Sequence, residues 1–405
     1  MKRKIGYIRA RYPEIRTIIN RGGSENAYIQ IGKLRNYYLL FTRACEILSG
    51  RFLRRGVNMN NDRHAIYRPI FSPKVDVIHT FNTVCDTDVP WVSTFETCIP
   101  RTNRTNGRDW EYGKVTPDAV TKKGYELLTR DNCLALIALS EANKNIQIRM
   151  MEALDIENRD KIQEKVVVVH PPQPVLITPE EMRVKFDGVH DCVEFILVGG
   201  LFFRKGGMQI VDAMQKLREQ GMRLHLTVVS SLTMDKFSQV TNEDKVRYEN
   251  ILASSDWITH YNSLPNAQVL ELCKKAHVGL LPSMADTYGY AVLEMQACGC
   301  PVITTDIRAL PEMNNDECGY LIRVPKQPST EAKYDTPEDF AALKDIIYTE
   351  LYRTISDILA NPDTIKAKGE AAVAKIQRDH SPEKYAETLS KIYSRADQNG
   401  DIASS

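Results

Sequence analysis

Two acidic residues, Asp286 and Glu294, flank a turn that contains Gly289. The turn follows an apolar run at 277–282 that is typical of a buried strand, and it precedes an amphipathic helix expected to begin near Ala291. A strand-to-helix junction of this kind offers backbone N–H groups and the positive end of the helix dipole. Two carboxylates beside it can accept hydrogen bonds from different hydroxyl groups of one ligand. The pattern therefore predicts a site for phosphate groups or sugar hydroxyls.

Two neighbouring cations, Arg204 and Lys205, lie in the stretch VGGLFFRKGG, directly after another apolar run that is typical of a strand. The apolar residues that follow are spaced as in a helix, which puts Lys205 near the start of that helix. A cation there opposes the helix dipole, because the positive end of the dipole lies at the amino terminus. This mild conflict favours a bound anion near Lys205 over an ordinary surface lysine.

The elements that would position these residues indicate a doubly wound α/β fold. Short apolar runs, mostly continuous rather than alternating, are typical of parallel strands covered by helices on both faces. They alternate with segments whose apolar residues are three and four apart, as in 206–221 and 25–48, and these segments predict helices. After a first strand in KIGYIRA, the predicted strands lie at 76–81, 91–95, 133–139, 165–170, 193–200, 224–230, 277–282 and 301–305.

A stretch at 171–191, first proline-rich and then polar, separates two such series of strands and helices. We therefore predict two Rossmann-like domains, one at 1–175 and the other at 190–380. From Thr336 onward the pattern predicts helices without strands. The segment 381–405 is expected to hold a helix that either completes the second domain or crosses back to the first, followed by a disordered tail in QNGDIASS.

The charges almost cancel, with 53 Lys and Arg against 52 Asp and Glu and a formal net charge of +1. That balance hides a division along the chain. Residues 1–70 hold fifteen Lys or Arg and four Asp or Glu, a net charge of +11, so the remaining 335 residues carry −10. A chain polarised in this way suggests an anionic partner for its basic end, such as a phosphorylated substrate, nucleic acid or a membrane surface.

The sequence excludes several classes of protein. No apolar run reaches the length of about 18 residues that predicts a transmembrane helix, and the basic amino terminus lacks the apolar core of a secretory signal. The nine cysteines are scattered, without a CxxC pair or the Cys and His spacing of a zinc site. We therefore expect reduced thiols, a cytoplasmic location and no bound metal.

Around Asp286 and Glu294 the sequence resembles the retaining family-4 glycosyltransferases, the glycosyl transferases group 1, whose two Rossmann-like domains face each other across a cleft in the GT-B fold. The resemblance implies that Asp286 contacts hydroxyls of the donor sugar, with Asp in place of the usual Glu, and that Glu294 binds the ribose of the nucleotide. It also implies that the loop amides at Tyr288, Gly289 and Tyr290 bind the sugar. The residues in register with the family signature are Pro282, Ser283, Asp286, Tyr288, Gly289, Glu294, Ala297, Gly299, Pro301 and Val302.

The stretch 198–214 resembles the family's V-G-R-x-x-x-x-K-G element. Lys205 falls where the family has its phosphate-binding Lys, whereas Gly200 stands where the family has an Arg. Arg204 is expected to supply the missing charge. A preorganised cation at the departing diphosphate stabilises the transition state more than the ground state, so we count Lys205 as catalytic as well as donor-binding, together with Asp286.

The N-terminal half resembles the family more weakly. The segment after the first strand resembles the family's glycine loop, which predicts that Gly22 and Gly23 let the backbone approach the ligand. Many relatives carry a His after their fourth strand, and here Glu96 occupies the corresponding place. As a catalytic group, Glu96 could accept a proton from the acceptor hydroxyl or stabilise charge at the anomeric carbon. It could equally be a structural partner of Arg101 or Arg104.

The resemblance implies an enzyme that moves a sugar from a donor such as a UDP- or GDP-sugar to the hydroxyl of a glycan, glycolipid or other acceptor, in polysaccharide, lipopolysaccharide or glycolipid biosynthesis. No cofactor and no nucleic-acid partner are expected, and the basic end predicts a peripheral contact with the cytoplasmic face of a membrane. A nucleotide-sugar epimerase or hydrolase of the same fold stays an alternative, as does a non-catalytic sugar-nucleotide-binding protein. A nicotinamide dehydrogenase is disfavoured, because GGLFFRKGG breaks the G-x-G-x-x-G turn.

Overall fold

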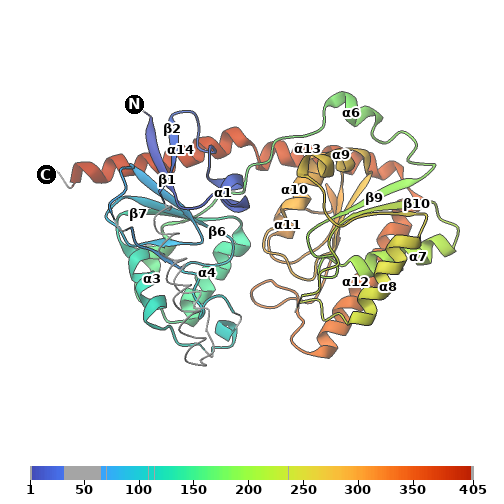
Figure 1. Ribbon diagram of the computed structural model, residues 1–405, viewed down its shortest axis with the longest axis horizontal. Coiled ribbons are helices and arrows are strands. Elements are labelled where there is room, and N and C mark those ends of the chain that lie inside the picture. Colours follow the sequence, from blue (N-terminus) through green and yellow to red (C-terminus); the bar gives the residue numbers. More distant parts are fainter. Residues whose placement is uncertain are drawn as a thin grey trace, which may run out of the picture. The chain divides into compact units, whose positions relative to one another are not determined.

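The chain forms two compact units (Figure 1). The first contains residues 1–172 together with the C-terminal segment that begins at Pro382, and the second contains Gln173–Ser381. The stretch predicted to lie between the domains therefore belongs to the second unit from Gln173 onward. The computed structural model describes residues 2–31, 65–69, 71–107, 109–113, 115–235 and 237–402.

The first unit is built on a six-stranded sheet of order β2-β1-β4-β6-β7-β8, in which all neighbouring strands are parallel. Two short strands, β3 (Ile66–Tyr67) and β5 (Val84–Cys85), pair separately. The six strands are β1 (Arg3–Tyr7), β2 (Asn26–Gln30), β4 (Val77–Phe81), β6 (Trp91–Phe95), β7 (Cys133–Ala138) and β8 (Val166–Val168).

Helices cover both faces of this sheet. They are α1 (Tyr12–Thr17), the 3-10 helix η2 (Asp109–Tyr112), α3 (Ala119–Thr129), α4 (Glu141–Ala153), α5 (Arg159–Gln163) and α14 (Pro382–Ile402). Ile78 and Leu136 belong to the core that includes α3 and α4. Their neighbours along the strands, Val77 and Ile137, belong to a separate core that includes α14. Because successive side chains of a strand point to opposite faces, two covered faces produce the continuous apolar runs of the sequence.

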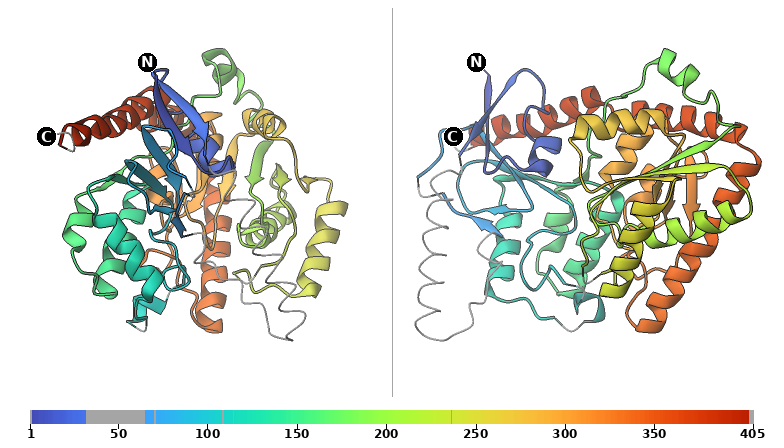
Figure 2. Two further views of the ribbon diagram at one scale, coloured as in Figure 1. Left: turned by 60° about the vertical axis from the view of Figure 1, so that its left-hand side comes forward. Right: turned by 45° about the vertical axis from the view of Figure 1, so that its right-hand side comes forward.

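The C-terminal helix α14 completes the first unit. The buried His79 of β4 makes hydrogen bonds to Tyr393 Oη of α14 at 2.7 Å and to Thr94 Oγ1 at 2.8 Å. Burial lowers the pKa of His79 to about 3, so this imidazole is a neutral part of the core. Arg3 of β1 forms an ion pair with Asp397 at 2.5 Å. In both views of Figure 2, α14 runs alongside the strands at the amino terminus.

The end of α14 differs from the predicted disordered tail, because the helix continues to Ile402. The segment 398–402 contains no Pro, and Gly400 lowers helix propensity by only about 1 kcal/mol relative to Ala. Extending a helix that is already formed costs far less than starting one, so a single Gly does not end it. The structure continues α14 through 398–402, the disorder of the tail stays a prediction, and 403–405 lie outside the described residues.

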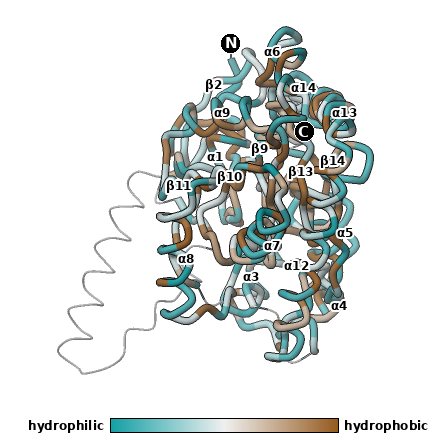
Figure 3. The backbone as a smooth tube through the Cα atoms, turned by 90° about the vertical axis from the view of Figure 1, so that its right-hand side faces the viewer, coloured by the Kyte–Doolittle hydropathy of each residue, from teal (hydrophilic) through white to brown (hydrophobic). Residues whose placement is uncertain are grey.

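The second unit is built on another wholly parallel sheet, of order β11-β10-β9-β12-β13-β14. Its strands β9 and β13 are strongly hydrophobic in Figure 3. The strands are β9 (Val193–Val198), β10 (Leu224–Val229), β11 (Ile258–Tyr261), β12 (Val278–Leu281), β13 (Val302–Thr305) and β14 (Gly319–Ile322).

The helices of the second unit are divided between the two faces of its sheet. They are α6 (Pro179–Val184), α7 (Gly207–Glu219), α8 (Asn242–Ser254), α9 (Asn266–Lys275), α10 (Tyr290–Ala297), α11 (Leu310–Met313), α12 (Pro337–Ala360) and α13 (Asp363–Asp379). Helices α7, α8 and α12 cover one face, and α9, α10 and α13 cover the other (Figure 1). This arrangement follows from the strand order, since right-handed crossovers in opposite directions place their helices on opposite faces.

The α/β fold class is confirmed, and each predicted apolar run contains a strand. The helix predicted at 25–48 is wrong at its start, because β2 occupies Asn26–Gln30. The rest of that prediction, from residue 32, lies outside the described residues. The sequence reading missed β11 and β14, because ITHY is half polar and GYLI begins with Gly, so neither forms a clear apolar run.

The described cysteines are free thiols, as predicted, and seven of these eight are buried. Among the helices that the structure describes, none is both long and apolar enough to cross a membrane. The same part of the chain contains no group of three or more His, Cys, Asp or Glu side chains arranged to hold a metal ion.

Candidate functional site

The sheet of the second unit changes direction at one point. The chain forms β9 first, adds β10 and β11 on one side, and then returns to add β12, β13 and β14 on the other. In open parallel sheets, ligands bind outside the carboxyl ends of the strands at such a switch point. Here the switch point lies between the loops that follow β9 and β12, and these two loops carry Lys205 and Asp286.

Lys205 and Asp286, predicted from separate motifs, contact each other at this edge. Lys205 Nζ donates a hydrogen bond to Asp286 Oδ2 at 2.5 Å, and the two side chains are only 11% and 13% exposed. The backbone joins the same loops, since Met284 N–H donates to the Arg204 carbonyl at 2.9 Å. A cation and a carboxylate held together in a mostly buried site can serve a phosphate and a hydroxyl of one ligand.

The close approach of the two loops depends on Gly206, the residue after Lys205. Gly206 has a φ of 78° and immediately precedes α7, a left-handed conformation that is costly for other residues. A Cβ added to Gly206 would lie 2.5 Å from the carbonyl oxygen of Pro282. Both the backbone conformation and the space therefore require glycine, which in turn fixes the position of Lys205.

Replacing Gly206 with Ala should destabilise the second unit by about 1–3 kcal/mol through the strained backbone alone. The clash with Pro282 should also displace Lys205 and weaken binding of the predicted nucleotide-sugar donor. Gly221→Ala is a matched control, because Gly221 has a φ of 85° but open space around the position of a Cβ. Urea unfolding and nucleotide titration measure the two effects. Equal losses of nucleotide affinity in both variants would contradict the role given to the close approach.

Arg204 turns away from the contact between Lys205 and Asp286. Its Nη1 lies 3.4 Å from Asp235 Oδ2 on the loop after β10, and its guanidinium carbon lies 5.6 Å from the centroid of the Phe237 ring. Because β10 and β12 flank β9 on opposite sides, the two predicted phosphate cations are spread along the sheet edge. The sequence reading missed Asp235, which belongs to an irregular loop without a motif.

The start of α10 holds the predicted sugar-binding loop. Gly289 precedes the helix with a φ of 93°, and no side chain caps this helix start. The positive end of the helix dipole is therefore not neutralised by a capping side chain. Tyr288 is 2% exposed, and its ring centroid lies 5.2 Å from that of Tyr290. These two rings pack on each other. A ligand can therefore reach the backbone of this loop more readily than it can reach the buried ring of Tyr288.

Glu294 lies one turn into α10 and is 8% exposed. Its charge contributes to the raised pKa of the buried Cys273 thiol, after the larger effects of the Cys298 thiol, of burial and of the Cys300 thiol. A carboxylate has acceptor positions for two adjacent hydroxyl groups, as a ribose presents them. One turn beyond Gly289, the Glu294 carboxylate is of the right chemical type for such a pair of hydroxyls.

Glu96 lies at the corresponding edge of the first unit, after β6. Asn82, which follows β4, donates from Nδ2 to Glu96 Oε1 and accepts the Glu96 N–H, both at 3.1 Å. Arg101 Nη1 donates to the same Glu96 Oε1 at 2.7 Å. The structural partnership of Glu96 with Arg101 is confirmed, whereas Arg104 lies 3.8 Å from Asp118. A catalytic role of Glu96 stays a prediction.

The loop that follows Glu96 is fixed by hydrogen bonds to its backbone. Gln147 of α4 accepts the Ile99 N–H at 2.7 Å and donates to the Ile99 carbonyl at 2.8 Å. Thr105 Oγ1 donates to the Pro100 carbonyl at 2.7 Å. Because rigid loops hold side chains in one geometry, this edge is preorganised for binding.

A pocket of about 380 Å³ opens at this edge of the first unit. Besides Glu96 and Arg101, its lining includes Arg9 and Arg11, which follow β1, and the buried Glu14 of α1. The first sheet changes direction between β1 and β4, so the pocket lies at its switch point. Arg9 and Arg11 were not predicted as site residues. Their position directly after the first strand does indicate that they reach the carboxyl edge of the sheet.

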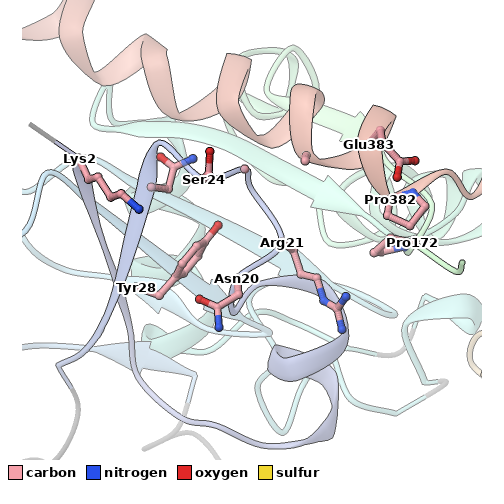
Figure 4. A pocket seen from close by; sticks show the side chains of 11 residues that line it. Lys2, Asn20, Arg21, Ser24, Tyr28, Pro172, Pro382 and Glu383 are labelled. Atoms are coloured by element: carbon pink, nitrogen blue, oxygen red, sulfur yellow. The ribbon is translucent and has the colours of Figure 1, made fainter.

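Gly22 and Gly23 lie at the opposite edge of this sheet. They precede β2, so they are at the amino ends of the parallel strands. Gly22 N–H donates to Tyr28 Oη at 2.8 Å, and a Cβ on Gly22 would clash with Tyr28 and with Tyr393 of α14. Their loop lines a separate pocket beside the first turn of α14 (Figure 4). The structure therefore corrects their predicted place, because the short helix α1 carries the chain back to the amino edge before the glycines.

The segment that carries the second-unit site has known relatives. Residues 180–335 match the family model for glycosyl transferases group 1. Among curated proteins, the glycogen synthase of Mycobacterium tuberculosis strain H37Rv is 23% identical over 201 residues, which are 49% of this chain and 42% of that enzyme. The chain spans less than half the length of the curated relatives it matches.

Solved structures resemble the chain over nearly its whole length. A glycosyltransferase from Rickettsia africae ESF-5 has a TM-score of 0.57 and 15% identity, and the match covers 98% of this chain and 99% of that one. Anabaena HepE, solved in complex with UDP and glucose, has a TM-score of 0.55 and 12% identity, covering 97% and 100%. At these identities the likeness shows the fold alone. The predicted GT-B fold is confirmed.

Proposed function

We propose that the protein is a retaining, metal-independent glycosyltransferase of family 4. It transfers a sugar from a nucleoside diphosphate sugar, such as a UDP- or GDP-sugar, to an acceptor hydroxyl in the synthesis of a polysaccharide, lipopolysaccharide or glycolipid. The observation that carries the proposal is the contact between Lys205 and Asp286 at the switch point of the second unit. Both residues belong to the segment that matches glycosyl transferases group 1.

In this proposal the donor replaces the internal contact with its own groups. The diphosphate accepts a hydrogen bond from the Lys205 ammonium in place of Asp286. The freed Asp286 carboxylate then accepts hydrogen bonds from the sugar hydroxyls. Glu294 accepts hydrogen bonds from the ribose, and Arg204 supplies a second cation on the β10 side of the loop. Backbone amides from Tyr288 to Tyr290 complete the sugar site at the uncapped start of α10.

The proposed reaction needs no cofactor. The bond between the anomeric carbon and the diphosphate oxygen breaks, and the acceptor oxygen bonds to that carbon on the same face. The acceptor proton passes to an oxygen of the departing diphosphate, so atoms and charge balance. Negative charge builds up on the diphosphate as it leaves, and Lys205 therefore stabilises the transition state more than the bound donor. Glu96 orients the acceptor hydroxyl from the first unit.

A donor screen followed by stereochemical analysis tests this function. UDP-, GDP- and ADP-sugars are titrated into the protein, and the best donor is incubated with hydroxylated acceptors. We expect a product whose anomeric configuration, read by proton NMR, matches that of the donor. An inverted product contradicts the retaining assignment. Conversion of the donor without any acceptor supports an epimerase or hydrolase, and binding without turnover supports a non-catalytic protein.

Replacing Glu294 with Ala should weaken binding of the free nucleoside diphosphate and of the sugar nucleotide by the same factor. Loss of a hydrogen bond to a charged group corresponds to about 10- to 100-fold in the dissociation constant. Glu219→Ala, at an exposed position of α7, is the matched control. Calorimetric titration measures both ligands. If only the sugar nucleotide binds more weakly, Glu294 contacts the sugar and the ribose role is wrong.

A further inference from the structure

We propose that the acceptor carries a phosphate group, and that Arg9 and Arg11 bind this group in the pocket at the carboxyl edge of the first unit. The inference rests on the proposed transferase function and names the class of acceptor that the first unit selects. That class is a hydroxylated phosphomonoester, either a free metabolite or the headgroup of a lipid. Its phosphate binds the two arginines while a hydroxyl lies near Glu96.

The position of the pocket is the first argument. The first sheet is built outward from β1, with β2 on one side and β4, β6, β7 and β8 on the other. The loops after β1 and β4 therefore border its switch point, where ligands of such sheets bind. Arg9 and Arg11 come from the first of these loops, and Asn82 comes from the second. The two arginines thus lie at a ligand edge rather than on an arbitrary surface.

The distribution of charge in the pocket is the second argument. Among the described residues that line it, three are arginines and two, Glu14 and Glu96, are acidic. The Glu96 carboxylate accepts hydrogen bonds from Arg101 and Asn82. Burial, and then the charge of Arg11, lowers the pKa of Arg9, while burial raises the pKa of Glu14. Arg9 and Arg11 therefore repel each other, and an anion bound beside both groups relieves that repulsion.

The geometry of guanidinium groups favours phosphate as that anion. A guanidinium presents its N–H donors in a planar fork that pairs with two oxygens at once. A phosphomonoester carries about −1.5 to −2 charges and three acceptor oxygens at neutral pH, so it can engage two arginines together. A carboxylate carries one charge and two acceptor oxygens, so it matches a pair of guanidinium groups less well.

The remaining lining of the pocket suits the hydroxylated part of such an acceptor. Asn82, Thr102 and Asn106 add neutral polar groups beside Glu96. The volume of about 380 Å³ falls near the lower end of the roughly 300–1,000 Å³ that is typical of small-molecule sites. Because the loop after Glu96 is held by Gln147, the pocket keeps its shape without a ligand. It therefore fits a phosphorylated sugar or polyol better than the interior of a polymer.

Titration of phosphorylated and neutral probes with the full chain tests the inference. The probes are glucose 6-phosphate against glucose, and glycerol 3-phosphate against glycerol, by calorimetry at low and high salt. The lipid arm uses co-sedimentation with vesicles that contain phosphatidylinositol 4-phosphate, whose headgroup carries a phosphomonoester, against phosphatidylcholine vesicles. The variants are Arg11→Gln, Arg9→Gln and the charge-preserving Arg11→Lys. Arg159→Gln is the control, since it removes the same charge from an exposed position of the first unit outside the pocket.

We expect at least one phosphorylated probe or the anionic vesicle to bind more than tenfold more tightly than its neutral counterpart, and more weakly at high salt. Arg11→Gln and Arg9→Gln should weaken this binding about 10- to 100-fold, Arg11→Lys by less, and Arg159→Gln not at all. Binding only to vesicles assigns the phosphate to a lipid headgroup, and binding to the free probes assigns it to a metabolite.

Equal affinity for phosphorylated and neutral probes overturns the inference, as does an equal loss in Arg159→Gln. The proposed transferase function is judged separately by UDP- and GDP-sugar binding in the same samples. A protein that binds and transfers the donor sugar but ignores every phosphorylated probe refutes only the acceptor class. A protein that binds phosphorylated probes but no sugar nucleotide refutes the transferase function instead.

Discussion

Replacing Lys205 with Ala is expected to lower kcat/KM for sugar transfer by about 2–4 kcal/mol of transition-state stabilisation, which is roughly 30- to 1,000-fold. The physical reason is that negative charge grows on the diphosphate only as the glycosidic bond breaks. Lys205 Nζ is largely buried and already fixed by the loops after β9 and β12. Once the diphosphate has replaced Asp286 as its partner, the Lys205 charge acts with little screening by solvent. Steady-state kinetics with the donor found by screening measure the effect.

The control for this variant has to separate catalysis from stability. Removing Lys205 leaves the Asp286 carboxylate, only 13% exposed, without its cation, and such a group is destabilising. The double variant Lys205→Ala with Asp286→Asn removes both charges, and urea unfolding shows whether the second unit is intact. Lys216→Ala, at an exposed position of α7, should keep wild-type kinetics. If kcat/KM stays near the wild-type value in Lys205→Ala, the lysine is not part of the mechanism.

Lowering the pH from 7 to 4.5 is expected to destabilise the second unit through His277. Its Nδ1 accepts the Glu194 N–H at 3.1 Å, and burial, followed by the charge of Lys185, lowers its pKa to about 4. The same side chain has a pKa of about 6.5 when unfolded. Below pH 6.5 the unfolded chain therefore binds a proton that the folded chain does not. The free energy of unfolding should therefore fall by about 2–3 kcal/mol between pH 7 and pH 4.5.

The variant His277→Asn isolates this effect from the titration of other groups. An Asn oxygen can accept the same Glu194 N–H but does not titrate, so this variant should lose about 2–3 kcal/mol less than the wild type over the interval. His190→Asn changes a side chain that is 64% exposed and should follow the wild type. Urea unfolding followed by circular dichroism at both pH values measures the difference. Identical losses in His277→Asn and the wild type would show that His277 is not the buried titrating group.

The positions of Lys205 and Asp286 at the sheet edge could be predicted because each residue belongs to a short strand-to-helix junction. Lys205 and Asp286 each follow a continuous apolar run and precede a helix, so their positions at the carboxyl edge follow from local sequence. Their contact also follows from topology, because β9 and β12 are neighbours. The orientation of Arg204 could not be predicted, since it depends on Asp235 in an irregular loop.

The first unit shows which features sequence patterns do not reveal. Helix α1 has six residues, too few to reveal a helical period, and without it Gly22 and Gly23 are assigned to the wrong end of the sheet. The pocket with Arg9 and Arg11 forms from the ends of three strands that are far apart in the chain, and no spacing connects them. In the sequence, Arg9 and Arg11 look like ordinary surface residues. Only the strand order shows that they lie beside the switch point of the sheet.

The sequence also left open whether the C-terminal helix α14 completes the second domain or packs on the first. Its apolar stripe predicts an amphipathic helix, but a stripe does not name the surface that it covers. Tyr385, Leu389 and Tyr393 complete a core with Val77 and Ile137 of the first sheet. That face of the sheet is apolar and would otherwise be exposed to solvent. The helix packs there because this buries both apolar surfaces.

The balance of released nucleotide and transferred sugar tests the central claim most directly. The protein is incubated with its best UDP- or GDP-sugar and with glucose 6-phosphate, glycerol 3-phosphate or phosphatidylinositol 4-phosphate vesicles, and all products are quantified by mass spectrometry. The account predicts one mole of nucleoside diphosphate for each mole of acceptor that gains a sugar, with Lys205→Ala strongly impaired in both. Release of nucleoside diphosphate with only free sugar, or an altered sugar still bound to its nucleotide, would contradict it.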